Sequence, residues 1–164
     1  MEAEPEITQR AAQPYVGIRG WVAMAAIGSI ADRIPEIFSW LGPRGIAPAG
    51  PPFFRYWVVN MEGELEVEAG VPVASAVQGD GAIGAGTLPA GRFVVVTHTG
   101  PPSTLVAATA ELLDWAGERG LVWDVSRTEA GVQWGCRLEF YLTNPVEQPD
   151  ASRWQTQLAF KLAD

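Results

Sequence analysis

The chain of 164 residues has the length of one domain, and its composition, 48% hydrophobic and 18% charged, excludes global disorder. Its net charge of -8 repels phosphate backbones, which excludes an electrostatic basis for nucleic-acid binding and favours organic cations. The N-terminus is not a secretory signal and every apolar run is far shorter than the ~20 residues that span a bilayer, so a cytoplasmic protein without membrane partners is expected.

The elements predicted along the chain form a β-α-β-β series that occurs twice. In the first half, a strand at residues 15–20 precedes an amphipathic helix, and strands at residues 53–59 and 64–73 follow it. In the second half, the strands that flank the helix are predicted at residues 92–100, 132–142 and 154–162. Residues 74–86 are the expected joint between the two halves.

The two helices provide the clearest sign of duplication, because residues 34–46 (IPEIFSWLGPRGI) align without gaps to residues 109–121 (TAELLDWAGERGL). Identical residues occupy five equivalent pairs: Glu36/Glu111, Trp40/Trp115, Gly42/Gly117, Arg44/Arg119 and Gly45/Gly120. A glycine at a helix end adopts the left-handed conformation that a β-carbon disfavours, which explains why the last pair recurs. The paired Trp40 and Trp115 are expected to pack in the core.

This organisation predicts an α+β fold made of a duplicated βαββ unit, with two antiparallel-rich sheets, helices on one face and a ligand cleft between the repeats. Residues 1–164 are expected to form a single domain, with repeat 1 at about residues 6–75 and repeat 2 at about residues 82–163. The functional side chains are therefore expected where the two repeats meet.

The predicted strand at residues 132–142 alternates between apolar and polar side chains. Its apolar face carries Val132, Trp134, Cys136, Leu138, Phe140 and Leu142. Its other face carries Gln133, Gly135, Arg137, Glu139 and Tyr141. The apolar face is expected to pack beneath a helix, so the polar face turns outward or into a cleft. Glu139 is the candidate functional carboxylate, and the alternative is an ion pair of Glu139 with Arg137 in solvent.

Aromatic residues are more numerous than a core of this size needs, at 10% of the chain with seven tryptophans. Flat rings stack on flat ligands at low entropic cost, and their negative π faces favour cations. Tyr15 and Trp21 share one face of the first predicted strand, and Phe54 and Tyr56 share one face of the next. These faces are candidate walls for a flat ligand.

The chain carries no strong metal, cofactor or nucleophile motif. Residues 79–84 (GDGAIG) match the glycine pattern of dinucleotide-binding loops, but a β-rich run follows them instead of a helix, so they are interpreted as a flexible loop. The single His98 and the single Cys136 cannot form a usual zinc site, and one cysteine excludes an internal disulfide. No metal and no cofactor are expected, and His98 is interpreted as a partner for backbone at a turn.

Several strings of the chain resemble, in order, those of GyrI-like small-molecule-binding domains. They are residues 50–56 (GPPFFRY), 70–73 (GVPV), 88–93 (LPAGRF), 98–101 (HTGP), 139–145 (EFYLTNP) and 154–158 (WQTQL). The resemblance spans roughly residues 6–163 and implies the duplicated βαββ fold. Domains of this family are effector-binding modules of AraC-type and MerR-type multidrug regulators, and they also occur as stand-alone proteins.

In this family the ligand, often a planar aromatic cation, lies between the repeats over a central glutamate. By position, the resemblance implies that the ligand-binding residues are Glu139, Tyr141, Tyr56, Trp21, Phe54 and Trp134. Trp134 conflicts with the alternation of its strand, which places it in the core. The chain also departs from the family at Pro102, where relatives often have an aromatic residue.

The leading hypothesis is a stand-alone multidrug or xenobiotic binding protein that holds flat aromatic, cationic compounds over Glu139. The alternative is a hydrolase, since some stand-alone relatives resemble enzymes that open cyclopropane rings, with Glu139 activating water and Tyr141 stabilising negative charge. Both residue types serve binding equally well, so the sequence leaves the two roles open. A third hypothesis is a module that binds a protein partner through its acidic surface. No sequence motif supports this hypothesis.

Overall fold

The computed structural model describes residues 3–164. The strands are β1 (Glu6–Arg10), β2 (Gln13–Ala23), β3 (Phe53–Val59), β4 (Glu64–Pro72), β5 (Gly84–Leu88), β6 (Gly91–Thr99), β7 (Val125–Thr128), β8 (Gly131–Trp134), β9 (Arg137–Tyr141) and β10 (Gln155–Lys161). The α-helices are α1 (Gly28–Ala31), α2 (Ile34–Leu41) and α3 (Leu105–Glu118). Short 3-10 turns are η1 (Met24–Ala26), η2 (Gly42–Arg44), η3 (Pro102–Thr104) and η4 (Ala151–Arg153).

All strands belong to one sheet, whose main path runs β1-β6-β10-β9-β3-β4-β2-β5, with β8 beside β3 and β7 beside β8. Two very short connections join strands that lie at opposite ends of this path. Ala11 and Ala12 link β1 to β2, and Pro89 and Ala90 link β5 to β6. Because two residues cannot cross a flat sheet of this width, the sheet must curl into a half-barrel.

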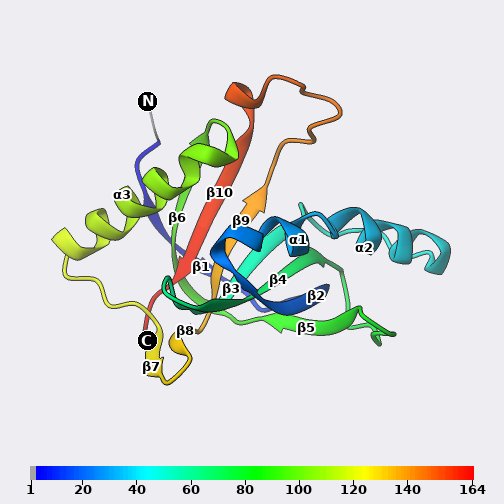
Figure 1. Ribbon diagram of the computed structural model, residues 1–164, viewed down its shortest axis with the longest axis horizontal. Coiled ribbons are helices and arrows are strands. Elements are labelled where there is room, and N and C mark those ends of the chain that lie inside the picture. Colours follow the sequence, from blue (N-terminus) through cyan, green and yellow to red (C-terminus); the bar gives the residue numbers. More distant parts are fainter. Residues whose placement is uncertain (1–2) are drawn as a thin grey trace.

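The predicted α+β class is confirmed, and the strands of the two repeats are continuous where two sheets were expected. In the middle of the sheet the two halves meet through the antiparallel pairing of β3 with β9, in which Phe54 lies directly opposite Glu139. Figure 1 shows α1 and α2 on one side of β9 and α3 on the other, all on one face of the sheet. The middle of that face, over β3 and β9, is therefore left without a covering helix.

The duplicated helix ends are closely alike in three dimensions. The Arg44 guanidinium carbon lies 4.1 Å from the Trp40 ring centroid, and that of Arg119 lies 4.0 Å from the Trp115 ring centroid. Each arginine also donates a hydrogen bond to the backbone oxygen of the tryptophan that it covers. The glycines that follow, Gly45 and Gly120, adopt φ of 68° and 67°, which confirms the predicted left-handed helix ends.

The helix predicted over residues 34–46 begins at Ile34 as α2, and the short α1 that precedes it is not continuous with it. Pro35 lies in the first turn of α2, where its missing N–H costs nothing. In a continuous helix the same ring would clash with the carbonyl of Ala31 and break a hydrogen bond. Proline thus starts a new helix at this point.

The strand predicted at residues 132–142 is also divided, into β8 and β9, and this reverses part of the expected packing. The Gly135 amide donates to the Asp124 carbonyl oxygen at 2.8 Å. This bond interrupts the pairing with β3 between the end of β8 and the start of β9. As a result Trp134 packs in the cluster beneath α3, whereas Cys136, Leu138 and Phe140 pack on the opposite, concave face. The prediction that the apolar set lies beneath a helix therefore holds for Val132 and Trp134 and is wrong for Cys136, Leu138 and Phe140.

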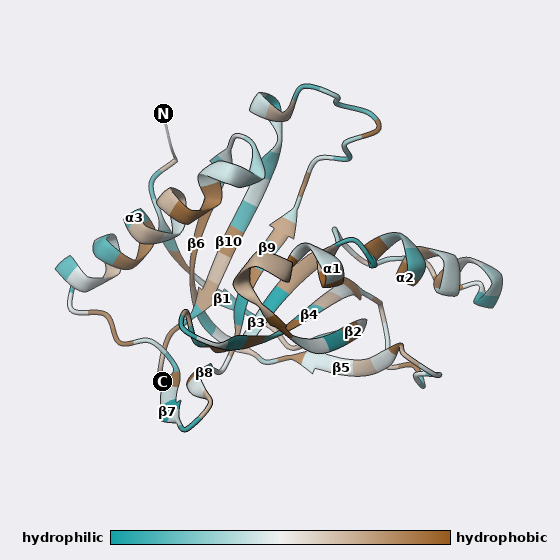
Figure 2. Cartoon of the chain, in the orientation of Figure 1, coloured by the Kyte–Doolittle hydropathy of each residue, from teal (hydrophilic) through white to brown (hydrophobic). Residues whose placement is uncertain are grey.

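Three hydrophobic clusters hold the fold together. One lies between α2 and strands β2 to β4, one between α3 and strands β6 and β10, and one on the concave face of the sheet. The ribbon of α3 in Figure 2 alternates between hydrophobic and hydrophilic stretches, as expected for a helix with one buried face. Within residues 3–164, no helix combines the length and apolar character needed to cross a membrane.

Candidate functional site

A cleft of about 1110 Å³ opens over the uncovered middle of the sheet, between α2 and α3. Its floor is formed by the inward-facing side chains of β3 and β9, which are Phe54, Tyr56, Glu139 and Tyr141. Ile34 and Phe38 of α2 form one wall, and Leu105 and Val106 of α3 form the other. The volume lies just above the range of about 300–1,000 Å³ typical of small-molecule sites.

Glu139 is a buried carboxylate at the floor of this cleft, with 7% of its surface exposed. The Tyr141 hydroxyl donates to its Oε1 at 3.2 Å, and the Tyr56 hydroxyl donates to its Oε2 at 3.3 Å. Within residues 3–164, no lysine, arginine or histidine nitrogen lies within ion-pair distance of Glu139. Burial raises the pKa of the carboxyl, and the Tyr141 hydrogen bond is the largest effect that opposes this rise.

Arg137 lies next to Glu139 in the floor but is held by aromatic rings. Its guanidinium carbon is 5.1 Å from the Tyr56 ring centroid, 5.1 Å from that of Trp134 and 4.8 Å from that of Phe160. Its Nε is buried and has no hydrogen-bond partner in the described chain. The alternative of a solvated Glu139–Arg137 ion pair is therefore not what the structure shows, because Glu139 is buried and contacts tyrosines instead.

The structure brings together four of the six residues that the resemblance placed at the site. Glu139, Tyr141, Tyr56 and Phe54 all line the cleft. Trp21 does not, because it lies on the face of β2 opposite to Val16 and Ile18 and is 47% exposed.

Trp134 does not line the cleft either. It packs against Trp123 and Phe160, at centroid distances of 5.5 and 5.6 Å, and supports the Arg137 guanidinium from below. Trp134 is thus buried in the core, as the alternation of residues 132–142 predicted. Because of the break at Gly135, it lies on the opposite face of the sheet from Cys136, Leu138 and Phe140.

The mouth of the cleft carries a ring of exposed apolar side chains that the sequence analysis did not identify. They are Phe38, Met61, Val106, Leu142 and Val146. Trp154 also lines the cleft, and its indole N–H donates to the Gln148 carbonyl oxygen at 2.6 Å, which fixes the loop between β9 and β10 beside the opening. The available signal was the presence of large apolar residues at positions that helical or loop periodicity places in solvent.

His98 and Pro102 lie at the start of the second helical segment. The Nε2 atom of His98 is 2.6 Å from Thr104 Oγ1, which itself donates to the Pro101 carbonyl oxygen, so this histidine stabilises the turn through a threonine. Pro102 lines the mouth of the cleft at the position where relatives often have an aromatic residue. Among residues 3–164, no three His, Cys, Asp or Glu side chains lie close enough to hold a metal ion.

Comparison with solved structures shows where this fold recurs. The chain is similar to the EcmrR C-terminal domain, with a TM-score of 0.74 and 19% identity over 98% of each chain. In EcmrR bound to DNA the matched chain is longer, and this chain covers 57% of it, at a TM-score of 0.76 and 20% identity over 98% of this chain. The search of curated proteins found no match.

Two further structures share the fold at lower identity. SAV2435 bound to tetraphenylphosphonium has a TM-score of 0.66 and 12% identity over 98% of this chain and 94% of that one. A hydrolase from Listeria innocua has a TM-score of 0.60 and 14% identity over 98% of this chain and 92% of that one. Identities this low establish similarity of fold and nothing about what this chain binds.

The family assignment rests on the sequence itself. The profile of the GyrI-like small molecule binding domain matches residues 3–162, which is nearly the whole chain. The curled sheet and the large cleft at the junction of the repeats agree with that match. The chain belongs to the family of GyrI-like small-molecule-binding domains.

Proposed function

We propose that this protein binds flat, hydrophobic organic cations in the cleft between α2 and α3, with Glu139 as the counter-charge. The observation that carries the proposal is a buried carboxylate at the floor of a mostly apolar cleft. Within residues 3–164 its hydrogen bonds come from two tyrosine hydroxyls, and the neighbouring Arg137 acts on it through space without an ion pair. An ionised carboxylate in such a place is costly unless a positive group arrives to pair with it.

The tyrosines fit this role better than basic residues would. Their hydroxyls keep the Glu139 oxygens oriented and partly satisfied without neutralising the charge, so the attraction for an incoming cation remains. The rings of Phe54 and Tyr56, which meet edge to face at 5.3 Å, provide apolar contact area on the same floor. Among the structural relatives, SAV2435 has been solved with tetraphenylphosphonium, a hydrophobic cation of tetrahedral shape, which supports a hydrophobic cationic ligand; the preference for flat rings rests on the aromatic floor of the cleft.

The direct test uses two tricyclic probes that differ in charge, proflavine as the cation and acridone as the neutral compound. Binding is followed by quenching of tryptophan fluorescence, for which Trp154 in the cleft wall is the expected reporter. We expect Glu139→Gln to weaken proflavine binding by about tenfold, a loss of about 1.4 kcal/mol, and to leave acridone binding nearly unchanged.

The matched control is Glu129→Gln, which removes the same charge from an exposed position that does not line the cleft. It should leave both affinities unchanged, since screened surface charges act weakly at long range. Equal binding of the two probes by the native protein, or an unaltered proflavine affinity in Glu139→Gln, would show that Glu139 does not provide the counter-charge.

A second function, hydrolysis of a strained electrophilic xenobiotic, is favoured by the raised pKa of Glu139 and by its contacts with Tyr56 and Tyr141. In that reaction Glu139 would take a proton from water as the water oxygen bonds to a cyclopropane carbon. The ring C–C bond to that carbon would break, its electron pair would move to the electron-withdrawing group of the xenobiotic, and the tyrosine hydroxyls would donate hydrogen bonds to the negative charge there until the proton returns to it. The test is product formation over many turnovers that is lost in Glu139→Gln. Capture of one equivalent of compound without product would exclude the enzyme and leave the binding protein.

A further inference from the structure

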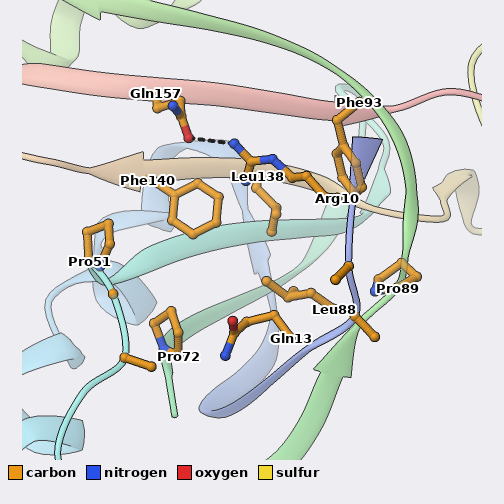
Figure 3. Close-up of a pocket in the computed structure, with 14 residues that line it drawn as sticks. Arg10, Gln13, Pro51, Pro72, Leu88, Pro89, Phe93, Leu138, Phe140 and Gln157 are labelled. Carbon is orange, nitrogen blue, oxygen red and sulfur yellow. Dashed lines mark hydrogen bonds between the residues drawn. The ribbon is translucent and has the colours of Figure 1, made fainter. Parts of the chain in front are cut away.

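A second pocket, of about 400 Å³, lies on the concave face of the sheet, away from the cleft. It opens where the strands from the two ends of the curled sheet approach each other, and Figure 3 shows Leu88, Phe93, Leu138 and Phe140 around it together with Pro51 and Pro72. On β9 the side chains alternate, so Leu138 and Phe140 face this pocket while Glu139 between them faces the cleft. The two cavities are therefore separated by the sheet.

Among the described residues of the lining, Arg10 at the end of β1 is the one with a charged side chain. Its guanidinium carbon lies 5.7 Å from the Phe93 ring centroid and 5.4 Å from that of Phe140. Its Nη2 donates to Gln157 Oε1 at 2.8 Å (Figure 3), and in residues 3–164 no carboxylate forms an ion pair with it. Burial lowers the pKa of Arg10, which shows that its charge is partly withdrawn from water.

The arrangement leaves hydrogen-bond donors directed at an anion. A guanidinium has five N–H donors, and Arg10 uses one of them in the contact with Gln157. The Gln157 side chain accepts that bond through its oxygen, so its amide nitrogen remains as a further donor that pairs with no other described residue. An apolar pocket with this single cationic corner matches a small amphipathic acid.

We propose that the concave pocket is a second binding site, selective for small organic carboxylates with an apolar body. The carboxylate forms an ion pair with Arg10 and accepts a hydrogen bond from the side-chain amide N–H of Gln157, and the apolar body contacts Leu88, Phe93 and Phe140. The site goes beyond the cation cleft, because its charge preference is opposite and its lining shares only Pro51 with that cleft.

The probe pair for this site is 2-naphthoate and its neutral analogue 2-naphthamide. Titration of the isotope-labelled protein is followed by the chemical shifts of its backbone amides in NMR spectra. We expect a dissociation constant of about 1 mM or lower for naphthoate, which is within reach for a ligand with so few non-hydrogen atoms. The shifts should concentrate at Leu88, Phe93 and Gln157 and should be absent at Met24 and Phe38, which line the cleft alone. Naphthamide should bind about tenfold more weakly, since it lacks the charge-assisted contact.

Two variants probe the site by different means. Arg10→Gln should weaken naphthoate binding by about tenfold and leave naphthamide unchanged, whereas Arg127→Gln, which removes the same charge from an exposed strand, should alter neither. Ala12→Trp should block both probes, because Ala12 is an exposed residue of the pocket lining whose enlargement fills the mouth while Arg10 itself is retained. Amide-shift dispersion without ligand reports whether each variant is folded, and if Arg10→Gln does not fold, Ala12→Trp decides.

Equal affinity of the two probes would overturn the proposal, as would naphthoate binding that survives in Arg10→Gln or in Ala12→Trp. Amide shifts centred on the cleft residues would also overturn it, as would the absence of any amide shift at naphthoate concentrations well above about 1 mM. These results do not depend on whether the cleft binds cations, because the cleft residue Glu139 stays in place throughout and its neighbours report separately.

Discussion

Two buried glutamates on opposite faces of the same sheet allow a test of whether the burial of Glu139 is uncompensated in the unliganded protein. Glu139 faces the cleft and Glu68 faces the concave side, with 7% and 6% of their surfaces exposed. Glu68 accepts short hydrogen bonds from Tyr15, at 2.6 Å, and from the Trp57 indole, at 2.9 Å, and it lies opposite Arg55 in the β3–β4 pairing. We therefore expect Glu139→Gln to stabilise the unliganded protein and Glu68→Gln to destabilise it.

The magnitude follows from what each carboxylate gains. Hydrogen bonds to a charged group contribute about 1.5–3 kcal/mol each, and the contacts of Glu139 at 3.2 and 3.3 Å belong at the weak end of that range. Their sum of about 3 kcal/mol falls short of a burial cost of several kcal/mol, which leaves a deficit of about 1 kcal/mol. Its removal should raise Tm by about 2–4 °C in a domain of this size. Loss of the strong contacts of Glu68 should cost about 2 kcal/mol and lower Tm by about twice as much.

Thermal unfolding as a function of pH is the appropriate assay. Because the pKa of Glu139 is raised in the folded protein, the unfolded chain loses this proton first as pH rises, and stability then declines. The advantage of Glu139→Gln should thus grow as pH rises above about 4.3, where the unfolded carboxyl ionises, and disappear below about pH 3, where the carboxyl is protonated in both states. A variant that is less stable than the native protein at neutral pH would show that Glu139 is a satisfied structural carboxylate, and the reasoning about a waiting counter-charge would fail.

Three further predictions concern the same side chains and the single cysteine. Tetraphenylphosphonium, whose charge is permanent, should bind more tightly as pH rises through the raised pKa of Glu139, and the affinity measured by fluorescence titration should become independent of pH in Glu139→Gln. Tyr141→Phe should weaken the same cation by about threefold at a pH below the raised pKa of Glu139, because the largest interaction that favours the ionised carboxyl is lost, and the difference should shrink as pH rises above that pKa. Burial raises the pKa of Cys136 to about 11, so mass spectrometry should show no iodoacetamide adduct at pH 8 until the protein is unfolded; rapid labelling of the folded protein would contradict its burial.

The sequence by itself determined the local elements and their repetition. Helix ends at Gly45 and Gly120 follow from conformations that only a few neighbouring residues set, which is why the duplicated segments could be aligned and their caps predicted. The period of two along residues 137–141 likewise placed Glu139 and Tyr141 on one face of a strand. The family resemblance then identified which carboxylate to examine.

Which face was covered could be decided only by the tertiary structure. Alternation shows which side chains share a face, but whether a helix lies over that face depends on pairings between distant strands such as β3 and β9. Because of the break at Gly135, Trp134 and Leu138 lie on opposite faces of the sheet, whereas alternation predicted one face. Trp21 lies on the face of β2 that turns away from the cleft. The concave pocket around Arg10 had no sequence signal at all, because its walls come from strands that meet only when the sheet curls.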